Sequence, residues 1–324
     1  MSIPRRLSRE AAQRDGEVVR IAGFLQEYRA LGGVAFAIVR DRVGSTQVTL
    51  KKGVAPPELF ALLADLPRES VVEVEGTIRR SEKANRGSEL FPTAIRVLSR
   101  AETPLPLGVV DKVGADLDTR FDHRFLDLRK PEVRAVFELR AALLAAFREA
   151  YRARGFLEVE TPKLLRQGAE GGATLFPVDY FGQRAFLAQS PQLYKQMLMA
   201  AGFERVFEIG PVFRAEPSDT VRHLTEIGML DAEMAYIDGA EDLRGMLEEV
   251  VRAALGSVRR SLTEAENPLA DGLPELAAPF PRIPFETAEA WLGRPGAERD
   301  FGTEDEKAIG ARVEREYGTP FYYL

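Results

Sequence analysis

The first hundred residues consist of short runs in which apolar and polar positions alternate. Alternation with a period of two and frequent β-branched residues are typical of strands. The five runs lie at 17–29, 34–44, 45–52, 71–81 and 89–99. A segment with helical spacing, 56–66, separates the third run from the fourth. Five strands with a helix after the third predict an OB-fold barrel over residues 1–100, a common nucleic-acid-binding module.

The pattern changes after residue 100. Residues 101–121 combine prolines and glycines without a clear period, which indicates a linker or hinge. Residues 122–324 then mix helical and strand-like segments and form a second predicted domain. Its predicted helices are 132–154, 241–260, 285–292 and 305–317, and its first predicted strand is 156–161. The fold class expected from this mixture is α+β.

Residues 207–236 form two strand-like runs joined by a polar loop. Side chains of a strand point to alternate faces, so charged positions two apart share a face. Val212, Arg214 and Glu216 share a face of the first run, and Asp231 and Glu233 share a face of the second. The planar guanidinium of Arg214 could clamp a phosphate, and Arg222 and His223 in the loop could hold the rest of a nucleotide. The alternative is an edge hairpin with a solvated, charged tip.

Two segments before this hairpin place polar residues in a defined local context. Glu170 lies among glycines, which let a loop move and approach a ligand. Ser190 and Pro191 predict the start of a helix, on which Gln192 and Lys195 share one side. The alternatives are an ordinary glycine turn and a lysine that faces solvent.

The charge balance differs along the chain. The whole chain has 44 Lys and Arg against 50 Asp and Glu, a net charge of −6. Residues 1–100 hold 17 basic against 12 acidic residues, or +5, so the remainder holds 27 against 38, or −11. A local basic surface on an acidic protein suits a nucleic acid held by a few phosphate contacts.

The residue types exclude several classes of site. Cysteine is absent, which excludes disulfides and thiolate metal sites, and two histidines are too few for a histidine-built site. No apolar run approaches the roughly 18 residues of a membrane span. The N-terminal residues lack the apolar stretch of a signal peptide. We therefore expect a cytoplasmic protein that does not enter a membrane.

Three blocks of sequence follow the barrel in an order typical of one enzyme family. They are RFLDLR at 124–129, LAQSPQLYKQMLM at 187–199 and VFEIGPVFRAE at 206–216. Over essentially the whole chain, this order resembles the aspartyl-tRNA synthetases of the archaeal type, which belong to class IIb of the class II synthetases. The resemblance implies an OB-fold anticodon-binding domain followed by a class II catalytic domain, an antiparallel sheet flanked by helices.

The resemblance also implies roles for single residues. Arg214 matches the catalytic arginine of the second class II motif, which bridges the ATP α-phosphate and the amino acid carboxylate. The positions that match ATP contacts are Arg214, Ala215, Glu216, Arg222, His223 and Leu224. The positions that match the aspartate pocket are Glu170, Ser190, Gln192, Lys195 and Asp231. The positions that match anticodon contacts are Gln26, Arg29, Phe36, Gln47, Asn85 and Glu89.

The implied reaction has two steps and uses ATP with Mg²⁺, L-aspartate and tRNA. The aspartate carboxylate attacks the ATP α-phosphorus to give aspartyl-adenylate, and the tRNA 3′ end then takes the aspartyl group. Lys195 favours aspartate, because a lysine neutralises the substrate side chain, whereas the asparaginyl relatives lack this lysine and often have glutamate at Asp231. The first class II motif, which spans 155–162 and the preceding helix, implies a homodimer.

Some features depart from the family pattern. The third class II motif, with its Mg²⁺ ligands, would lie beyond Leu324, so we expect no metal site within this chain. We also expect a truncated chain that does not aminoacylate tRNA by itself. Residues 217–219 differ from the usual loop. Gln26 and Asn85 match neither known pattern, which leaves open whether only the aspartate tRNA or also the asparagine tRNA is accepted.

Two other classes of function stay open at this point. The chain could be a catalytically inactive, tRNA-binding paralogue or fragment, which the missing third motif favours and the intact Arg214, Lys195 and Glu170 disfavour. It could instead be an amidating paralogue that makes asparagine. Those proteins resemble the catalytic domain without the barrel, so retained tRNA binding would separate the first alternative from the second.

Overall fold

The computed structural model describes residues 3–110, 114–166, 175–215, 224–274, 276, 279–294, 296 and 300–324. The chain forms two compact units, residues 1–133 and 134–324. The predicted linker, 101–121, lies within the first unit, and a helix begins inside it at Leu117. The domain boundaries at residues 100 and 121 stay predictions.

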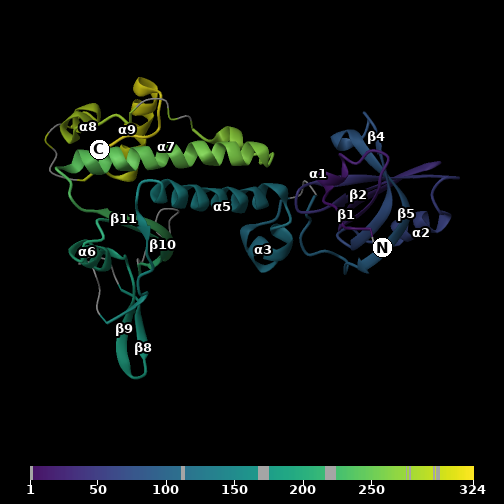
Figure 1. The fold of residues 1–324 in the computed structure, drawn as a ribbon, viewed down its shortest axis with the longest axis horizontal. Coiled ribbons are helices and arrows are strands. Elements are labelled where there is room, and N and C mark those ends of the chain that lie inside the picture. Colours follow the sequence, from purple (N-terminus) through teal and green to yellow (C-terminus); the bar gives the residue numbers. More distant parts are fainter. Residues whose placement is uncertain are drawn as a thin grey trace. The chain divides into compact units, whose positions relative to one another are not determined.

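The first unit contains a closed five-stranded barrel, which confirms the predicted OB fold (Figure 1). Its strands are β1 (Val18–Leu31), β2 (Val34–Arg40), β3 (Ser45–Lys51), β4 (Val71–Arg80) and β5 (Ser88–Ser99), and they pair in the order β1-β2-β3-β5-β4. Helix α2 (Pro57–Asp65) follows the third strand, as predicted. Every second side chain of a barrel strand points into the core. In β2, Ala35, Ala37 and Val39 are buried, while the residues between them are partly exposed.

Short helices complete the first unit. They are α1 (Ser8–Ala11), η1 (Asn85–Gly87), α3 (Leu117–Asp122) and α4 (Arg124–Asp127). The Asp116 carboxylate accepts a hydrogen bond from the backbone N–H of Thr119 at 2.7 Å and so caps α3. Leu126 of α4 is buried against Leu107 and Val109. The segment after the barrel is therefore packed, with its own small core.

Asp127 is the centre of an ion-pair cluster at the end of α4. Its carboxylate, which has no exposed surface, lies 2.9 Å from Arg120 Nε, 2.6 Å from Arg124 Nη1 and 3.7 Å from Lys130 Nζ. The hydrogen bond from Arg120 holds the pKa of Asp127 below its ordinary value, against burial, which acts in the opposite direction. The cationic side chains themselves cover this carboxylate.

Replacing Asp127 by asparagine is expected to speed hydrogen exchange in α3 and α4 at neutral pH. The expected loss of local stability is about 1–2 kcal/mol, between the values for exposed and buried ion pairs. Because the folded-state pKa is depressed, the contribution of the carboxylate is present above its unfolded pKa of about 3.9 and is lost as pH falls through the folded value. The difference between variant and wild type should therefore shrink in acid.

A difference that persists unchanged in strong acid would contradict the charge-pairing explanation. Asp65→Asn is the control, because Asp65 pairs with Arg100 on the open surface and its loss should leave exchange unchanged.

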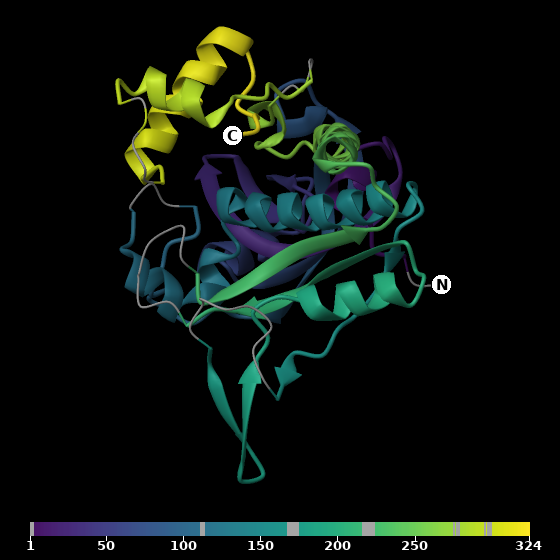
Figure 2. The same ribbon diagram turned by 90° about the vertical axis from the view of Figure 1, so that its left-hand side faces the viewer.

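The second unit is built on a three-stranded sheet with helices on both faces (Figure 2). The strands β6 (Leu157–Glu158), β10 (Arg205–Phe213) and β11 (Glu226–Met234) pair in the order β11-β10-β6. The long helices α5 (Pro131–Arg152) and α7 (Ala240–Glu264) cover one face, and α6 (Gln192–Ala200) lies on the other. The sheet is mixed rather than antiparallel throughout, because β6 reaches its parallel neighbour β10 through a long crossover.

The predicted helices of this unit are confirmed within a few residues. The helix predicted at 132–154 ends at Arg152, and Gly155 follows with φ +78°, a conformation that favours glycine just past a helix end. On the side of α5 that faces the sheet, the ring of Tyr151 stacks on the ring of Phe207, with 5.0 Å between the two ring centroids. Burial raises the pKa of this tyrosine.

Smaller elements surround this sheet. A second sheet in the order β7-β9-β8 is formed by β7 (Leu164–Leu165), β8 (Pro177–Tyr180) and β9 (Gln183–Leu187). Figure 1 shows its hairpin projecting from the unit. The C-terminal helices α8 (Phe285–Trp291) and α9 (Thr303–Tyr317) agree with the predicted ones, and η2 (Ala270–Gly272) precedes them. Within the described ranges, no helix has the length and apolar character needed to cross a membrane.

Candidate active site and nucleic-acid interface

One face of the β10–β11 hairpin gathers acidic side chains. The strand register places Glu208 opposite Asp231. Their neighbours Phe207 and Ala232 point the other way, into the apolar core under α5 and α7. By alternation, Glu233 shares the face of Asp231. Asp231 and Glu233 thus share a face, as the alternation along the strand predicted, and this face lies toward α6.

Lys195 projects from α6 into this acidic face and is 1% exposed. Its Nζ lies 2.5 Å from Asp231 Oδ1 and 3.1 Å from Glu233 Oε2, and it donates to the backbone oxygen of Ala232 at 3.1 Å. Two of the three N–H donors of this ammonium group thus have hydrogen-bond acceptors, and Glu233 adds an ion pair. A buried charge requires such pairing. The alternative of a solvent-facing lysine is wrong.

Ser190 and Gln192 lie at the start of the same helix. The helix begins at Gln192, one residue later than predicted, and the buried Ser190 Oγ accepts a hydrogen bond from the Gln192 N–H at 3.2 Å. The Gln192 Nε2 donates to Glu233 Oε2 at 3.5 Å. Sequence reasoning left Glu233 out of the predicted pocket, although its spacing from Asp231 placed it on the same face.

Arg214 follows directly after β10. Its backbone N–H donates to the Thr225 carbonyl at 3.0 Å, which continues the hairpin by one step. Its Nε is buried and has no hydrogen-bond partner in the part of the chain that the structure describes. An unsatisfied buried donor of this kind costs about 1–3 kcal/mol, more for a charged group, which a bound anion would remove.

Parts of the predicted aspartate pocket and of the predicted nucleotide site fall in two segments whose structure is not described. The residues concerned are Glu170, Glu216, Arg222 and His223, which lie outside the described residues. At the edges of the second segment, Ala215 is partly exposed and Leu224 is exposed. The roles of all six residues stay predictions.

Glu208 is a buried carboxylate that sequence reasoning missed. It accepts hydrogen bonds from the Thr161 backbone N–H and Oγ1, both at 2.8 Å, and from Lys163 Nζ at 2.8 Å. It thus fixes the segment after β6 to β10, and its only sequence signal is a charge inside an apolar strand. In the ranges that the structure describes, no group of three or more histidine or acidic side chains could hold a metal ion.

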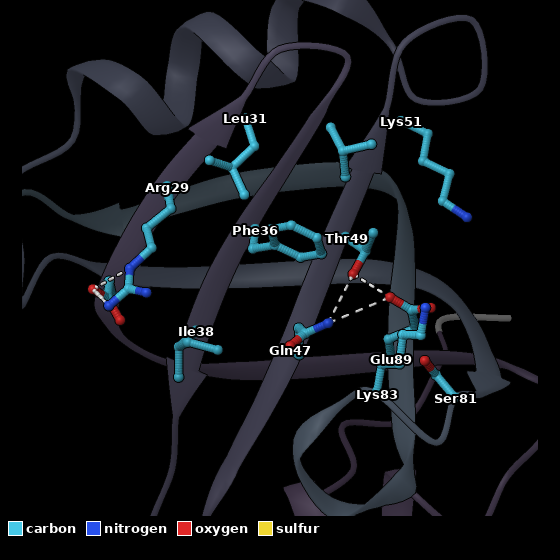
Figure 3. Close-up of a pocket in the computed structure, with 12 residues that line it drawn as sticks. Arg29, Leu31, Phe36, Ile38, Gln47, Thr49, Lys51, Ser81, Lys83 and Glu89 are labelled. Carbon is cyan, nitrogen blue, oxygen red and sulfur yellow. Dashed lines mark hydrogen bonds and ion pairs between the residues drawn. The ribbon is translucent and has the colours of Figure 1, made fainter.

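The barrel carries a groove of about 500 Å³ on its outer face (Figure 3). Its floor is formed by β1, β2 and β3, and residues near the start of β5 close one side. Four of the six residues predicted to contact an anticodon line it, namely Arg29, Phe36, Gln47 and Glu89. Two parts of the sequence that are more than forty residues apart are brought together here, as the resemblance implied.

The centre of the groove combines an aromatic ring with fixed polar groups. Phe36 lies in the middle of Figure 3. Next to it, the Gln47 amide donates to Glu89 Oε2 at 3.4 Å, and the buried Thr49 Oγ1 donates to the same oxygen at 2.5 Å. Aromatic rings stack on bases, and anchored amides and carboxylates read base edges, so this arrangement suits an unpaired nucleotide.

The remaining predicted anticodon contacts lie apart from the centre. The Arg29 guanidinium is held by Glu27 at 2.7 Å. Gln26 is outside the groove lining and accepts a hydrogen bond from Arg40 Nη1 at 3.4 Å. Asn85 belongs to η1, and its side chain is outside the described structure.

Two family models match successive parts of the chain. The family model "OB-fold nucleic acid binding domain" matches residues 19–98, and "tRNA synthetases class II (D, K and N)" matches residues 116–324. The aspartate–tRNA(Asp/Asn) ligase of Methanopyrus kandleri is 48% identical over 94% of this chain and 72% of the relative. The aspartate–tRNA(Asp) ligase of Thermococcus kodakarensis is 45% identical over 96% of this chain and 72% of the relative.

Solved structures show the same architecture. The asparaginyl-tRNA synthetase of Pyrococcus horikoshii, in complex with asparaginyl-adenylate, has a TM-score of 0.85 at 30% identity and covers 96% of this chain and 73% of its own. The aspartyl-tRNA synthetase of Entamoeba histolytica has a TM-score of 0.83 at 27% identity, and the match covers 98% of this chain and 69% of the synthetase. The barrel, the paired carboxylates around Lys195 and these matches agree, and the chain belongs to the class II tRNA synthetases, in the group of the aspartate–tRNA ligases.

Proposed function

We propose that this chain binds L-aspartate and ATP, forms aspartyl-adenylate and transfers the aspartyl group to tRNA. The observation that carries the proposal is the buried ammonium of Lys195, held between Asp231 and Glu233. A cation in a site closed to water interacts strongly with an anionic side chain of a substrate. The names of the curated relatives support the same substrate.

Entry of aspartate requires an exchange at Lys195. In the protein without substrate, two hydrogen bonds and the ion pair with Glu233 surround this ammonium group, so an incoming carboxylate has to replace one of these partners. Glu233 forms the longer of the two ion pairs and is 26% exposed, which makes it the acceptor that can turn toward water. Asp231 then keeps the ammonium in place, while Ser190 and Gln192 border the bound amino acid.

Adenylate formation rests on positioning and charge neutralisation. One carboxylate oxygen of aspartate attacks the α-phosphorus of ATP, the bond from this phosphorus to the bridging oxygen breaks, and pyrophosphate leaves. Arg214 is the catalytic residue in this proposal, because the several donors of its planar guanidinium, among them the unpartnered Nε–H, can bind both the α-phosphate and the attacking carboxylate. No protein nucleophile is needed, since holding the two reactants in line supplies much of the acceleration.

Further parts of the proposal follow from the resemblance. Glu170 would meet the amino group of aspartate, Glu216 the adenine side of ATP, and Arg222, His223 and Leu224 the bent triphosphate. Mg²⁺ would arrive with ATP as part of the substrate and neutralise its phosphates. A homodimer would form through the first class II motif at 155–162.

Aspartate-dependent ATP–pyrophosphate exchange tests the catalytic part. It is measured on this chain and on an extended chimera, in which the C-terminal part of the Methanopyrus relative follows Leu324. Exchange with aspartate and not with asparagine, in either form, supports the proposal. No exchange in either form, with tRNA binding retained, would favour an inactive tRNA-binding paralogue.

The barrel groove is the proposed site for the anticodon. Its aromatic centre suits base stacking, and Lys51 and Lys83 at its border provide positive charge for the phosphates. A relative named for the tRNAs of both aspartate and asparagine and one named for the aspartate tRNA alone match at similar identity, so both tRNAs are tested.

Replacing Phe36 by alanine is expected to weaken binding of an anticodon stem–loop RNA by about 1–3 kcal/mol, the value of one base stacked on an aromatic ring. Fluorescence anisotropy with labelled RNA measures this change. Phe60→Leu, on helix α2 against the barrel core, controls for altered folding. Unchanged affinity in Phe36→Ala would remove the groove as the anticodon site. Aspartate-dependent exchange without tRNA should stay the same in this variant.

A further inference from the structure

Glu69 is a buried glutamate in the loop between α2 and β4. It is 4% exposed and has φ +68°, in the left-handed region that residues other than glycine rarely adopt. Its backbone pairs with β1: the Glu69 N–H donates to the Leu25 carbonyl, and the Leu25 N–H donates to the Ser70 carbonyl, both at 2.8 Å. The loop is therefore fixed against one point of the barrel.

Two arginines converge on the Glu69 carboxylate. Arg40, at the end of β2, donates from Nη2 to both carboxylate oxygens, at 3.0 and 2.8 Å. Arg129, which follows α4, donates to Oε2 at 3.1 Å. The guanidinium of Arg129 also lies 4.2 Å from the centre of the Phe24 ring. Glu69 thus joins two barrel strands to the helical segment 114–130, β1 through its backbone and β2 through its carboxylate.

The same contacts surround an irregularity in β1. Leu25 pairs with Val39 and Glu27 with Ile38, so Gln26 is an extra residue without a partner in β2. Such a bulge redirects the side chains near it. Gln26 is held by Arg40, and Arg40 by Glu69. The position of Gln26 is therefore set by the Arg40–Glu69 pair on one side and by the Leu25 backbone on the other.

This cluster continues the face of the nucleic-acid groove. Phe36 and Ile38 of β2 line the groove, and Arg40 is the next residue on the same face because side chains alternate along a strand. On β1, Glu27 lines the groove directly beside Gln26. When one RNA base lies against Phe36, an adjacent base of the same RNA therefore lies within reach of the Gln26 amide.

We propose that Glu69 is a positioning residue for RNA binding, which holds Arg40 and the bulged Gln26 in one orientation and fastens the groove face to the helical segment through Arg129. The inference rests on the proposed anticodon function of the groove. Glu69 itself does not touch the RNA. It acts through Gln26, so its loss should reduce discrimination between bases and leave phosphate contacts unaffected.

A purely stabilising ion pair would behave differently. Removing a carboxylate beside two arginines makes the surface more positive, so general RNA affinity should stay equal or rise. Only a positioning role predicts that discrimination falls at the same time. Glu73 provides a matched control, because its carboxylate also binds two arginines, Arg20 and Arg96, but on another part of the barrel.

The test compares Glu69→Gln with Glu73→Gln in the full chain. Binding is measured for an anticodon stem–loop of the aspartate tRNA and for loops with each anticodon base changed in turn. In Glu69→Gln, the preference at one position should fall about fivefold or more, the lower end of the value of a paired base contact. The Glu73→Gln protein should keep the preferences of the wild type.

A double-variant cycle separates action through Gln26 from general loosening. Combining Gln26→Ala with Glu69→Gln should reduce discrimination no further than Gln26→Ala alone, because residues that act as a unit are not additive. Additive losses would overturn the proposal. Arg129→Lys keeps the charge but not the planar group over Phe24, so it should lower the same base preference to a smaller extent. This variant replaces Glu69→Gln in the test if Glu69→Gln folds poorly.

Hydrogen exchange provides a readout that does not depend on RNA. In Glu69→Gln, peptides covering 24–30 and 114–130 should exchange faster. Glu73→Gln should leave both unchanged, because its partner Arg20 lies nearer the start of β1. Two results would overturn the positioning role. One is hydrogen exchange in Glu69→Gln that equals that of the wild type. The other is a wild-type protein that discriminates between the loops and a Glu69→Gln protein that discriminates equally well. If the wild type binds none of the loops, the proposed anticodon function of the groove fails first, and the role of Glu69 in RNA binding fails with it.

Discussion

Replacing Arg214 by alanine is expected to lower kcat for aspartate-dependent ATP–pyrophosphate exchange by about 100- to 1,000-fold, the effect of removing one electrostatic donor from a developing charge. The buried Nε of this residue has no partner among the described residues, so its hydrogen bond is available to substrate. Because charge on the α-phosphate grows in the transition state, the loss should appear in kcat more than in KM.

The form of the side chain matters as well as its charge. Arg214→Lys keeps a cation but loses the planar pair of donors that can bind two oxygens together, so we expect only partial recovery. Arg184→Ala is the control, since Arg184 lies on β9 over the Phe186 ring and takes no part in the proposed site. Exchange that is fully retained in Arg214→Ala, measured on the extended chimera, would exclude the proposed catalytic role.

The hairpin that carries Arg214 shows how far a sequence pattern can determine a site. Alternation along β10 and β11 predicted which residues share a face, because the side-chain period of a strand is two. The strand register then places Asp231 opposite Glu208. In the folded unit, Lys195 Nζ of α6 lies 2.5 Å from Asp231 Oδ1. The pairing of a helix residue with a strand residue follows from packing, which the pattern alone does not contain.

The residues missed by sequence reasoning have a common physical cause. Glu208 and Glu69 are single acidic residues whose partners come from distant segments, so no local spacing marks them. The mixed sheet has the same origin, because the direction of β6 depends on a crossover of some fifty residues rather than on its own sequence.

The barrel was more predictable than the catalytic unit. Five alternating runs with a helix after the third determined its topology, and Phe36, Gln47 and Glu89 meet in its groove. Gln26 is the exception. A bulge shifts the alternation at this point, so its direction depends on Arg40 and the loop around Glu69 rather than on its place in the strand.

Replacing Lys195 by methionine is expected to lower kcat/KM for aspartate by roughly 30- to 5,000-fold, which corresponds to the 2–5 kcal/mol lost when one partner of a buried charge pair is removed. Methionine has a similar length and no charge, so the change removes the ammonium with little change in volume. Activation of asparagine needs no cation for its amide, so its rate should fall less. The preference for aspartate over asparagine is therefore the quantity to measure, by exchange with each amino acid on the extended chimera.

Stability has to be separated from specificity in this experiment. Without the ammonium, the Asp231 and Glu233 carboxylates face each other without a cation, which destabilises the unit. Lys195→Met combined with Asp231→Asn relieves this repulsion and should recover stability, but not the preference for aspartate. Lys307→Met, on the exposed surface of α9, should change neither. A folded Lys195→Met protein that still prefers aspartate would mean that another cation neutralises the substrate side chain, and that Lys195 serves only to hold Asp231 and Glu233 in place.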